Sequence, residues 1–183
     1  MSSSFFFFKR LGLSVALWAL VSTSALAQQA IKIGWLSSLT GPLSSAAIAE
    51  NMGVQLAVEE INKAGGILGR PIELLTRDTA GDPTKAVNFA QQLAFSDKVH
   101  AVIGPVNSGE GLASTPILAR AGVPNLAIGA VDELIDPVKY PRAFRVINTN
   151  RQWISTANDY ALRVLKKTKV AVIADTSGYG TSS

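Results

Sequence analysis

The chain has 183 residues, of which 48% are hydrophobic, 17 are Lys or Arg, 13 are Asp or Glu, and none is Cys. Without Cys there is no disulfide, no thiolate metal site and no thiol nucleophile. The only histidine is His100, so a histidine metal cluster cannot form within one chain, and a Ser/His/Asp triad would have to use this imidazole.

The first 27 residues have the pattern of a secretory signal peptide. Lys9 and Arg10 precede an apolar run at 11–21, and the small residues Ala25-Leu26-Ala27 follow. The apolar run is shorter than the roughly 20 residues that a membrane-spanning helix needs. We therefore expect cleavage after Ala27 and export to the periplasm.

The positive charge does not indicate a nucleic-acid partner. Without Lys9 and Arg10 the net charge falls from +4 to +2, and the remaining charges are spread along the chain. The one dense basic stretch, 166–169, lies at the end of a predicted helix, where cations suit the negative pole of the helix dipole. We expect no nucleic-acid partner.

The mature part alternates between predicted strands and helices. Strands are expected at 31–36, 71–77, 99–103, 123–128 and 170–174, with a short extended piece at 143–147. Helices are expected at about 45–64, from Asp82-Pro83 onward, after Ser108 and around Ile154 to Leu165. This alternation predicts a parallel sheet covered by helices on both faces.

Several helices carry more detailed signals. In the first, the face expected to pack on the sheet consists of Gly53, Val54, Ala57, Val58 and Ile61, with Asn51, Gln55, Glu59 and Asn62 opposite. Asp82 is the expected N-cap of the second helix, with Pro83 at its first position and Ala86, Ala90 and Leu93 buried. Pro116 is expected to kink or restart the helix that follows Ser108. His100, at the entry of a strand, is expected at the surface or at a strand edge.

The loops after the strands are the expected ligand site, because ligands of open parallel sheets lie beyond the carboxyl ends of the strands. These loops are 38–45, 105–109, 129–132 and 175–180. They carry small residues and hydroxyl groups and few charges. Such loops offer backbone N–H groups at helix N-termini, which suit a carboxylate.

Ser108 does not fit a reactive motif. A nucleophile elbow needs Gly two residues to either side, where this chain has Val106 and Glu110. The chain also lacks the Gly-Lys-Ser/Thr sequence of a phosphate loop and the triple-glycine turn of a dinucleotide site. What remains for Ser108 is an N-cap, either purely structural or shared with a bound anion. We expect no enzymatic activity and no cofactor.

Several segments together resemble the substrate-binding proteins of branched-chain amino acid (leucine/isoleucine/valine-type) ABC transporters. They are Leu39-Thr40-Gly41-Pro42, Ile61 to Glu73, Asp78 through Asp82-Pro83, Val102-Ile103-Gly104-Pro105 and Gly122-Val123-Pro124. The resemblance covers the whole mature chain, and the segment from Ile61 to Glu73 is its most specific part.

This resemblance implies an α/β fold of the type I periplasmic binding kind, with two doubly wound parallel-sheet lobes that close by a hinge. Residues 28–148 would form the N-terminal lobe, without its C-terminal return, and 149–183 the incomplete start of the second lobe. Relatives need about twice this length, since two domains of about 100 to 150 residues are required. The chain is therefore expected to be an N-terminal fragment. The full-length protein would be a monomer that binds a small amino-acid-like ligand and delivers it to a membrane permease.

The resemblance also assigns ligand-binding positions. Ser108 matches the residue whose hydroxyl and neighbouring backbone bind the ligand carboxylate, Gly129 and Ala130 complete that grip, and Tyr179 lines the cleft from the second lobe. Ala46 stands where leucine-binding relatives have an aromatic residue, and Val131 where they have a threonine. These departures leave other amino acids, aromatic acids and amides open as ligands. An exported sensor module with the same fold is the alternative to a transport protein.

Overall fold

One parallel sheet forms the centre of the computed structural model, which describes residues 29–176 and 179–180. The predicted signal peptide, 1–27, lies outside the described residues. The five strands are β1 (Ile31–Ser37), β2 (Ile72–Asp78), β3 (Ala101–Ile103), β4 (Asn125–Ala127) and β5 (Ala143–Arg145). They are all parallel and lie in the order β2-β1-β3-β4-β5. The predicted parallel α/β class is confirmed.

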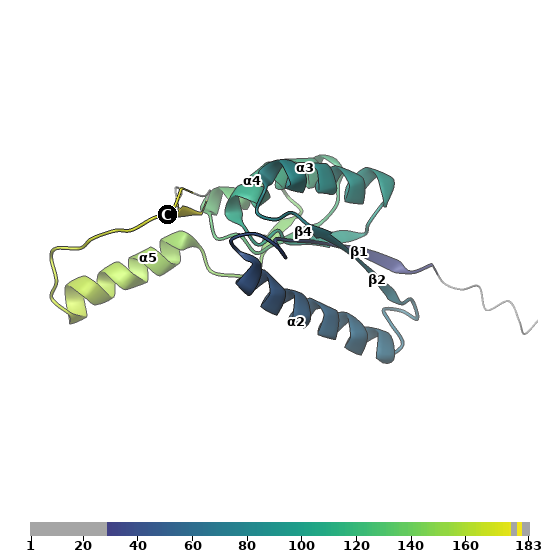
Figure 1. Ribbon diagram of the computed structural model, residues 1–183, viewed down its shortest axis with the longest axis horizontal. Helices are drawn as coiled ribbons and strands as arrows, with labels where there is room; N and C mark the ends of the chain where they lie inside the picture. Colours follow the sequence, from purple (N-terminus) through teal and green to yellow (C-terminus); the bar gives the residue numbers. More distant parts are fainter. Residues whose placement is uncertain (1–28, 177–178, 181–183) are drawn as a thin grey trace, which may run out of the picture.

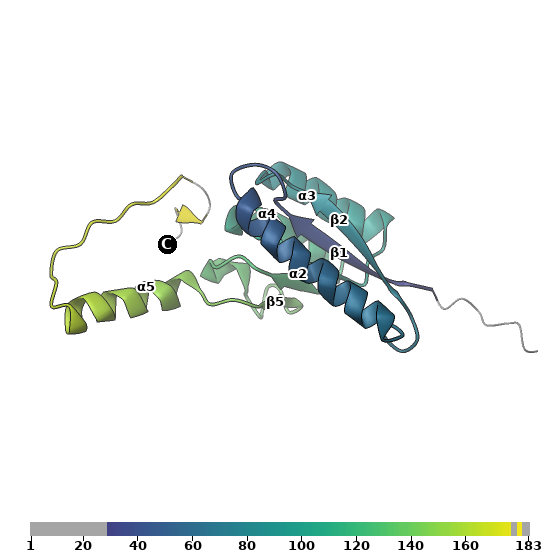
Figure 2. The same ribbon diagram turned by 60° about the horizontal axis from the view of Figure 1, so that its bottom comes forward.

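Helices cover both faces of the sheet, as Figures 1 and 2 show. Helix α2 (Ser44–Lys63) lies on one face. Helices α3 (Pro83–Gln91), extended by a π-helical turn at Gln92–Ser96, and α4 (Ser108–Arg120) lie on the other. A 3₁₀ turn at Asp132–Leu134 follows β4, and α5 (Asn150–Asp159) continues as a π-helical turn at Tyr160–Val164. This last helix projects beyond the sheet.

The main apolar core lies between the sheet and helices α3 and α4. Its buried residues are Leu36, Ala90, Leu93, Val99, Val102, Leu118 and Val123. The start of α3 is as predicted: the Asp82 side chain accepts hydrogen bonds from the backbone N–H groups of Thr84 and Lys85, and Pro83 occupies the first turn. Helix α4 continues through Pro116, so the helix does not restart there.

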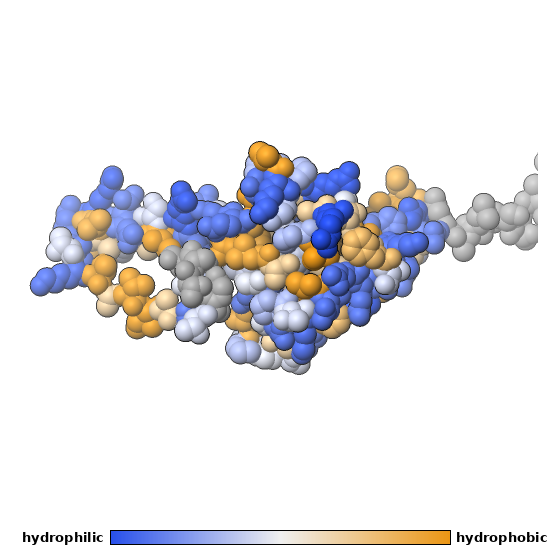
Figure 3. Space-filling model, turned by 90° about the horizontal axis from the view of Figure 1, so that it is seen from above, coloured by the Kyte–Doolittle hydropathy of each residue, from blue (hydrophilic) through white to orange (hydrophobic). Residues whose placement is uncertain are grey.

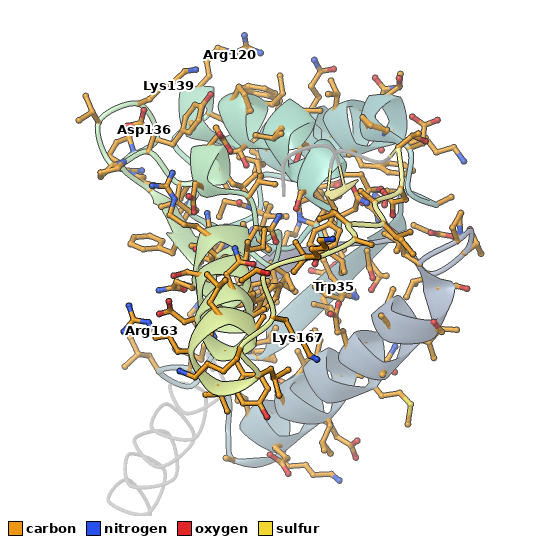
Figure 4. The ribbon with its side chains drawn as sticks, turned by 90° about the vertical axis from the view of Figure 1, so that its left-hand side faces the viewer. Trp35, Arg120, Asp136, Lys139, Arg163 and Lys167 are labelled. Atoms are coloured by element: carbon orange, nitrogen blue, oxygen red, sulfur yellow. The ribbon has the colours of Figure 1, made fainter. Side chains whose placement is uncertain are left out.

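The predicted packing face of α2 is only partly right. Val54 and Val58 face the sheet as predicted, together with Ala47, Asn51 and Asn62, whereas Gly53, Ala57 and Ile61 are exposed. Asn51 faces inward because its Oδ1 accepts a hydrogen bond from the indole Nε1 of buried Trp35, at 3.0 Å. Asn62 does so because its side chain pairs with both the N–H and the carbonyl group of Ile72, at the start of β2. Trp35 is fully buried and is labelled in Figure 4.

The strand predicted at 170–174 is absent, and these residues have no regular structure. Val172 and Ile173 are almost fully exposed, because this segment lies away from the sheet and has no strand beside it to complete its hydrogen bonds. Hydrophobic side chains are also exposed on the π-helical turn after α5, at Leu162 and Val164. Figure 3 shows hydrophobic residues open to solvent on this projecting part. Within residues 29–176 and 179–180, no helix has both the length and the apolar character needed to cross a bilayer.

Candidate ligand-binding cleft

A cleft of about 740 Å³ opens at the carboxyl ends of the strands. The chain passes from β1 outward to β2 and then to β3 on the other side of β1, so the strand order reverses between β1 and β3, the usual ligand position in such sheets. Lining residues come from the loops after the five strands, from the first two turns of α2 and from the C-terminal part of the described chain. They are Pro42, Leu43, Ala46, Glu50, Ala80, Gly81, Asp82, Val106, Asn107, Ser108, Ile128, Ala130, Ile147, Trp153, Asp175 and Tyr179.

Ser108 lies at the start of α4 but is not its N-cap. The cap is Asn107, whose Oδ1 accepts hydrogen bonds from the N–H groups of Gly109 (2.8 Å) and Glu110 (3.4 Å). Ser108 is the first helical residue and is 1% exposed, and its hydroxyl accepts a hydrogen bond from the N–H of Ala130, at 3.2 Å. A hydroxyl has one proton to donate and two lone pairs that accept. The bond from Ala130 therefore leaves the Ser108 proton available for a ligand oxygen.

Gly129 brings the loop after β4 close to Ser108. A Cβ atom at this position would lie 3.1 Å from the Ser108 Cα and 3.0 Å from the Leu134 Cδ2. Only a residue without a side chain allows this contact without displacing its neighbours. Gly129 itself does not line the cleft, and its effect on the site comes from this close packing.

Val131 does not line the cleft either. Its side chain is fully buried against Ala127 and Leu134 in a small apolar cluster. The 3₁₀ turn that begins at Asp132 folds Leu134 back over this position, which a sequence pattern does not reveal. Of the six residues expected to bind ligand, those that line the cleft are Ala46, Ser108, Ala130 and Tyr179.

Aromatic side chains enter the cleft from the C-terminal part of the chain. Tyr179 is 42% exposed, and Trp153, in the first turns of α5, is 43% exposed. Trp35, in contrast, is buried, so the two tryptophans have different places, and Trp153 is a lining residue that the sequence pattern did not indicate.

The loop after β1 is held in place by the loop after β2. Asp78 accepts hydrogen bonds from the Thr40 hydroxyl (2.7 Å), the Thr40 N–H (3.2 Å) and the Ala80 N–H (3.0 Å). Burial alone would raise the pKa of Asp78, but these hydrogen bonds outweigh it and lower the pKa below its usual value. Gly41 approaches the Ala80 carbonyl so closely that a Cβ would lie 2.7 Å from its oxygen, and its φ of 83° also favours glycine. The edge of the cleft is therefore fixed.

A fully buried polar cluster joins α4 to the ends of β1 and β2. Glu110 is 0% exposed, and its Oε2 accepts a hydrogen bond from the Ser38 hydroxyl at 2.9 Å. The Ser38 hydroxyl lies 3.4 Å from that of Thr79, which donates to the Ser37 carbonyl at 3.0 Å. A carboxylate in the first turn of a helix also suits the positive pole of the helix dipole. This cluster was not predicted.

The charged groups that line the cleft are all acidic. They are Glu50, Asp82 and Asp175, and among the described residues no Lys or Arg lines it. Burial raises the pKa of Glu50 above its usual value, and its Oε2 is buried without a hydrogen-bond partner in the described part of the chain. The lining therefore combines neutral donors at Ser108 with negative charge elsewhere.

The histidine lies at the other end of the sheet. His100 is exposed, precedes β3 and accepts a hydrogen bond from the Lys32 N–H at its Nδ1, at 3.2 Å. Ser108 follows β3, so the strand separates the two side chains, and the expected surface position of His100 is confirmed. In the described part of the chain, no three His, Cys, Asp or Glu side chains are grouped so that they could hold a metal ion.

Comparison with known proteins identifies the family. The sequence profile of the family described as periplasmic binding protein matches residues 30–183. The chain belongs to this family. The Leu/Ile/Val-binding protein BraC3 of Rhizobium johnstonii is 33% identical over 168 residues, which cover 92% of this chain and 46% of that protein. The chain thus spans about half the length of this relative.

Solved structures of periplasmic binding proteins agree. The branched-chain amino acid transporter substrate-binding protein LivJ from Streptococcus pneumoniae, in complex with isoleucine, is 33% identical with a TM-score of 0.68, over 75% of this chain and 39% of LivJ. A solute-binding protein of an ABC transporter from R. palustris, in complex with benzoate, is 27% identical with a TM-score of 0.66, over 73% of this chain and 37% of that protein. These likenesses confirm the expected type I periplasmic binding fold and the resemblance to branched-chain amino acid binding proteins.

Proposed function

We propose that this protein is an extracytoplasmic solute-binding protein that captures a small amino acid and delivers it to an ABC permease. The observation that carries the proposal is the Ser108 side chain, which lies at the N-terminus of α4, accepts a hydrogen bond from the Ala130 N–H and lines a cleft at the switch point of the sheet. Neutral donors at a helix N-terminus bind a carboxylate without a metal or a cation.

Two features bear on the ligand. Isoleucine and benzoate, bound by the two structural relatives, share a carboxylate group. In this chain the carboxylates of Glu50, Asp82 and Asp175 also line the cleft, with no basic side chain among the described lining. The acidic side chains repel a ligand whose only charged group is a carboxylate, whereas they attract the ammonium group of an amino acid. The acidic lining therefore favours a zwitterionic amino acid over a simple aromatic acid.

Transport is favoured over signalling by the relatives. Both structural relatives are described as proteins of transporters, and no observation on this chain points to a signalling partner. The pattern of residues 1–27 supports export, and the proposed location is the periplasm. N-terminal sequencing of the protein recovered from the periplasmic fraction should begin at Gln28.

The test is a binding screen on the protein expressed from the complete reading frame of its gene. Isothermal titration with leucine, isoleucine, valine, benzoate and leucinamide should give saturable binding of an amino acid, weaker binding of benzoate and weaker binding of the amide. Deletion of the gene should abolish uptake of the bound amino acid by cells. A protein that binds none of these compounds, or uptake that survives the deletion, would exclude the proposed function.

A further inference from the structure

The guanidinium group of Arg145, on the edge strand β5, contacts the loop after β4 at residues 130–132. Arg145 lies opposite Ala127 in the register of β4 and β5, at the carboxyl end of both strands. Its neighbours alternate in the manner of a strand: Phe144 is exposed, while Ala143 and the Arg145 side chain, the latter 9% exposed, face inward. An inward-facing cation on an edge strand needs acceptors in compensation.

Those acceptors are three consecutive backbone carbonyl groups of the loop. Arg145 Nη1 donates to the Ala130 carbonyl at 3.0 Å, and Nη2 donates to the carbonyls of Val131 and Asp132, the latter at 3.4 Å. The Asp132 carboxylate also lies 3.8 Å from Nη1. A planar guanidinium with five N–H donors can hold several acceptors at once, which a lysine ammonium cannot do in the same fixed geometry.

Ala130 connects this contact to the proposed carboxylate site. Its carbonyl is held by Arg145 and by the N–H of Asn150, at 2.9 Å, and its own N–H donates to the Ser108 hydroxyl. Because that N–H occupies one lone pair of the Ser108 oxygen, the position of Ala130 decides where the hydroxyl proton can point. If the Ala130 carbonyl loses its hydrogen bond from Arg145, the loop can shift, and the hydrogen bond from the Ala130 N–H to Ser108 can be lost as well.

We propose that Arg145 is a positioning residue for the ligand carboxylate: it fixes loop 130–132, and the loop orients the Ser108 hydroxyl through the Ala130 amide. The inference rests on the proposed function, since it needs a ligand with a carboxylate at Ser108. Arg145 does not touch the ligand in this arrangement and acts only through the loop.

The test compares acids with their amides. The Kd values of leucine and leucinamide, and of benzoate and benzamide, are measured for the wild type, Arg145→Gln and Arg145→Lys in the protein from the complete reading frame. Arg142→Gln is the matched control, because Arg142 also donates to a backbone carbonyl, that of Gly122, but at the amino end of β5, away from the cleft. The cooperative unfolding transition of each variant is recorded in parallel.

Arg145→Gln should weaken binding of the acid by about 10- to 150-fold, the range of one hydrogen bond to a charged group, and should weaken binding of the amide less, because the amide accepts only a neutral hydrogen bond. Arg145→Lys should lose less, and Arg142→Gln should keep the wild-type preference for the acid. Equal losses for acid and amide, unchanged affinities, or loss of cooperative unfolding in both Arg145 variants would overturn the inference and leave Arg145 a structural role. A wild type that binds none of the four compounds would instead overturn the proposed function.

Discussion

Replacing Ser108 by alanine tests the proposed carboxylate site directly. The side chain is 1% exposed and has one proton for the ligand, so its loss removes one hydrogen bond to a charged group. Such bonds contribute about 1.5–3 kcal/mol, which corresponds to a Kd weaker by about 10- to 150-fold. The same substitution leaves the N–H of Ala130, a residue only 3% exposed, without its acceptor. That should lower the free energy of unfolding by about 1–3 kcal/mol.

Ser114→Ala is the matched control for this experiment. Ser114 lies on the same helix and is equally buried, but its hydroxyl donates to the Glu110 carbonyl at 2.8 Å and does not line the cleft. Its loss can change stability but should leave ligand affinity unchanged. Isothermal titration gives the affinity and urea unfolding the stability. Wild-type affinity in Ser108→Ala would refute the assignment of the carboxylate to this hydroxyl, whatever the unfolding curve shows.

Three further substitutions probe residues in and next to the cleft. Gly129→Ala brings a Cβ to 3.1 Å from the Ser108 Cα and should cost about 1–3 kcal/mol in stability while weakening ligand binding, as unfolding and titration would show. Asp78→Asn removes the charge that accepts from Thr40 and should cost about 1 kcal/mol at neutral pH. Because the folded-state pKa of Asp78 is lowered, its stabilisation is present above the usual value of 3.8 and is lost as pH falls through the folded-state value, so the difference from wild type should shrink in acid. The pKa of Glu50 is raised in the folded state, so the contribution of Glu50 to stability is favourable below pH 4.5 and is lost as pH rises through the folded-state pKa. Glu50→Gln should therefore increase the free energy of unfolding at neutral pH. Urea melts of both proteins below pH 4.5 and at neutral pH would check this.

Local signals in the sequence were enough for most of the fold. The first strand was expected at 31–36 and spans Ile31–Ser37, and the first helix was expected at about 45–64 and spans Ser44–Lys63. Asp82 followed by Pro83 fixes the start of α3, because both act on the first turn of the helix alone. Features of this kind depend on residues close in sequence, and a single chain displays them.

The packing face of α2 could be found only in part in this way. Apolar periodicity placed Val54 and Val58 on the inward side correctly, but that side also carries two asparagines, while Gly53 and Ile61 are exposed. Asn51 bonds to the indole of Trp35 and Asn62 to the backbone of Ile72, and both partners belong to strands. Which side of a helix is buried can therefore be decided by a few polar partners that only the folded sheet brings within reach.

The candidate site was predicted in position more than in detail. Strand ends pointed to the loops that do line the cleft, but Ser108 was expected to be the cap that Asn107 provides. Both residue types cap helices well, and the two positions are adjacent, so sequence alone cannot choose between them. The burial of Val131 follows from the 3₁₀ turn after it. Arg145 carried one local signal, a position in alternation with Ala143 in a short strand, but its three carbonyl acceptors are contacts made only by folding.

The two sides of the cleft differ in how firmly their residues are held. On the sheet side every loop is tied to another: Thr40 to Asp78, Ser108 to Ala130, and Ala130 to Arg145. These bonds are made within the protein, so the free-energy cost of ordering the loops belongs to folding and does not weaken binding. Trp153 and Tyr179, which line the cleft from the C-terminal part of the described chain, are each more than two-fifths exposed. The proposed carboxylate site lies on the sheet side, so we expect substitutions there, such as Ser108→Ala, to change stability and affinity together.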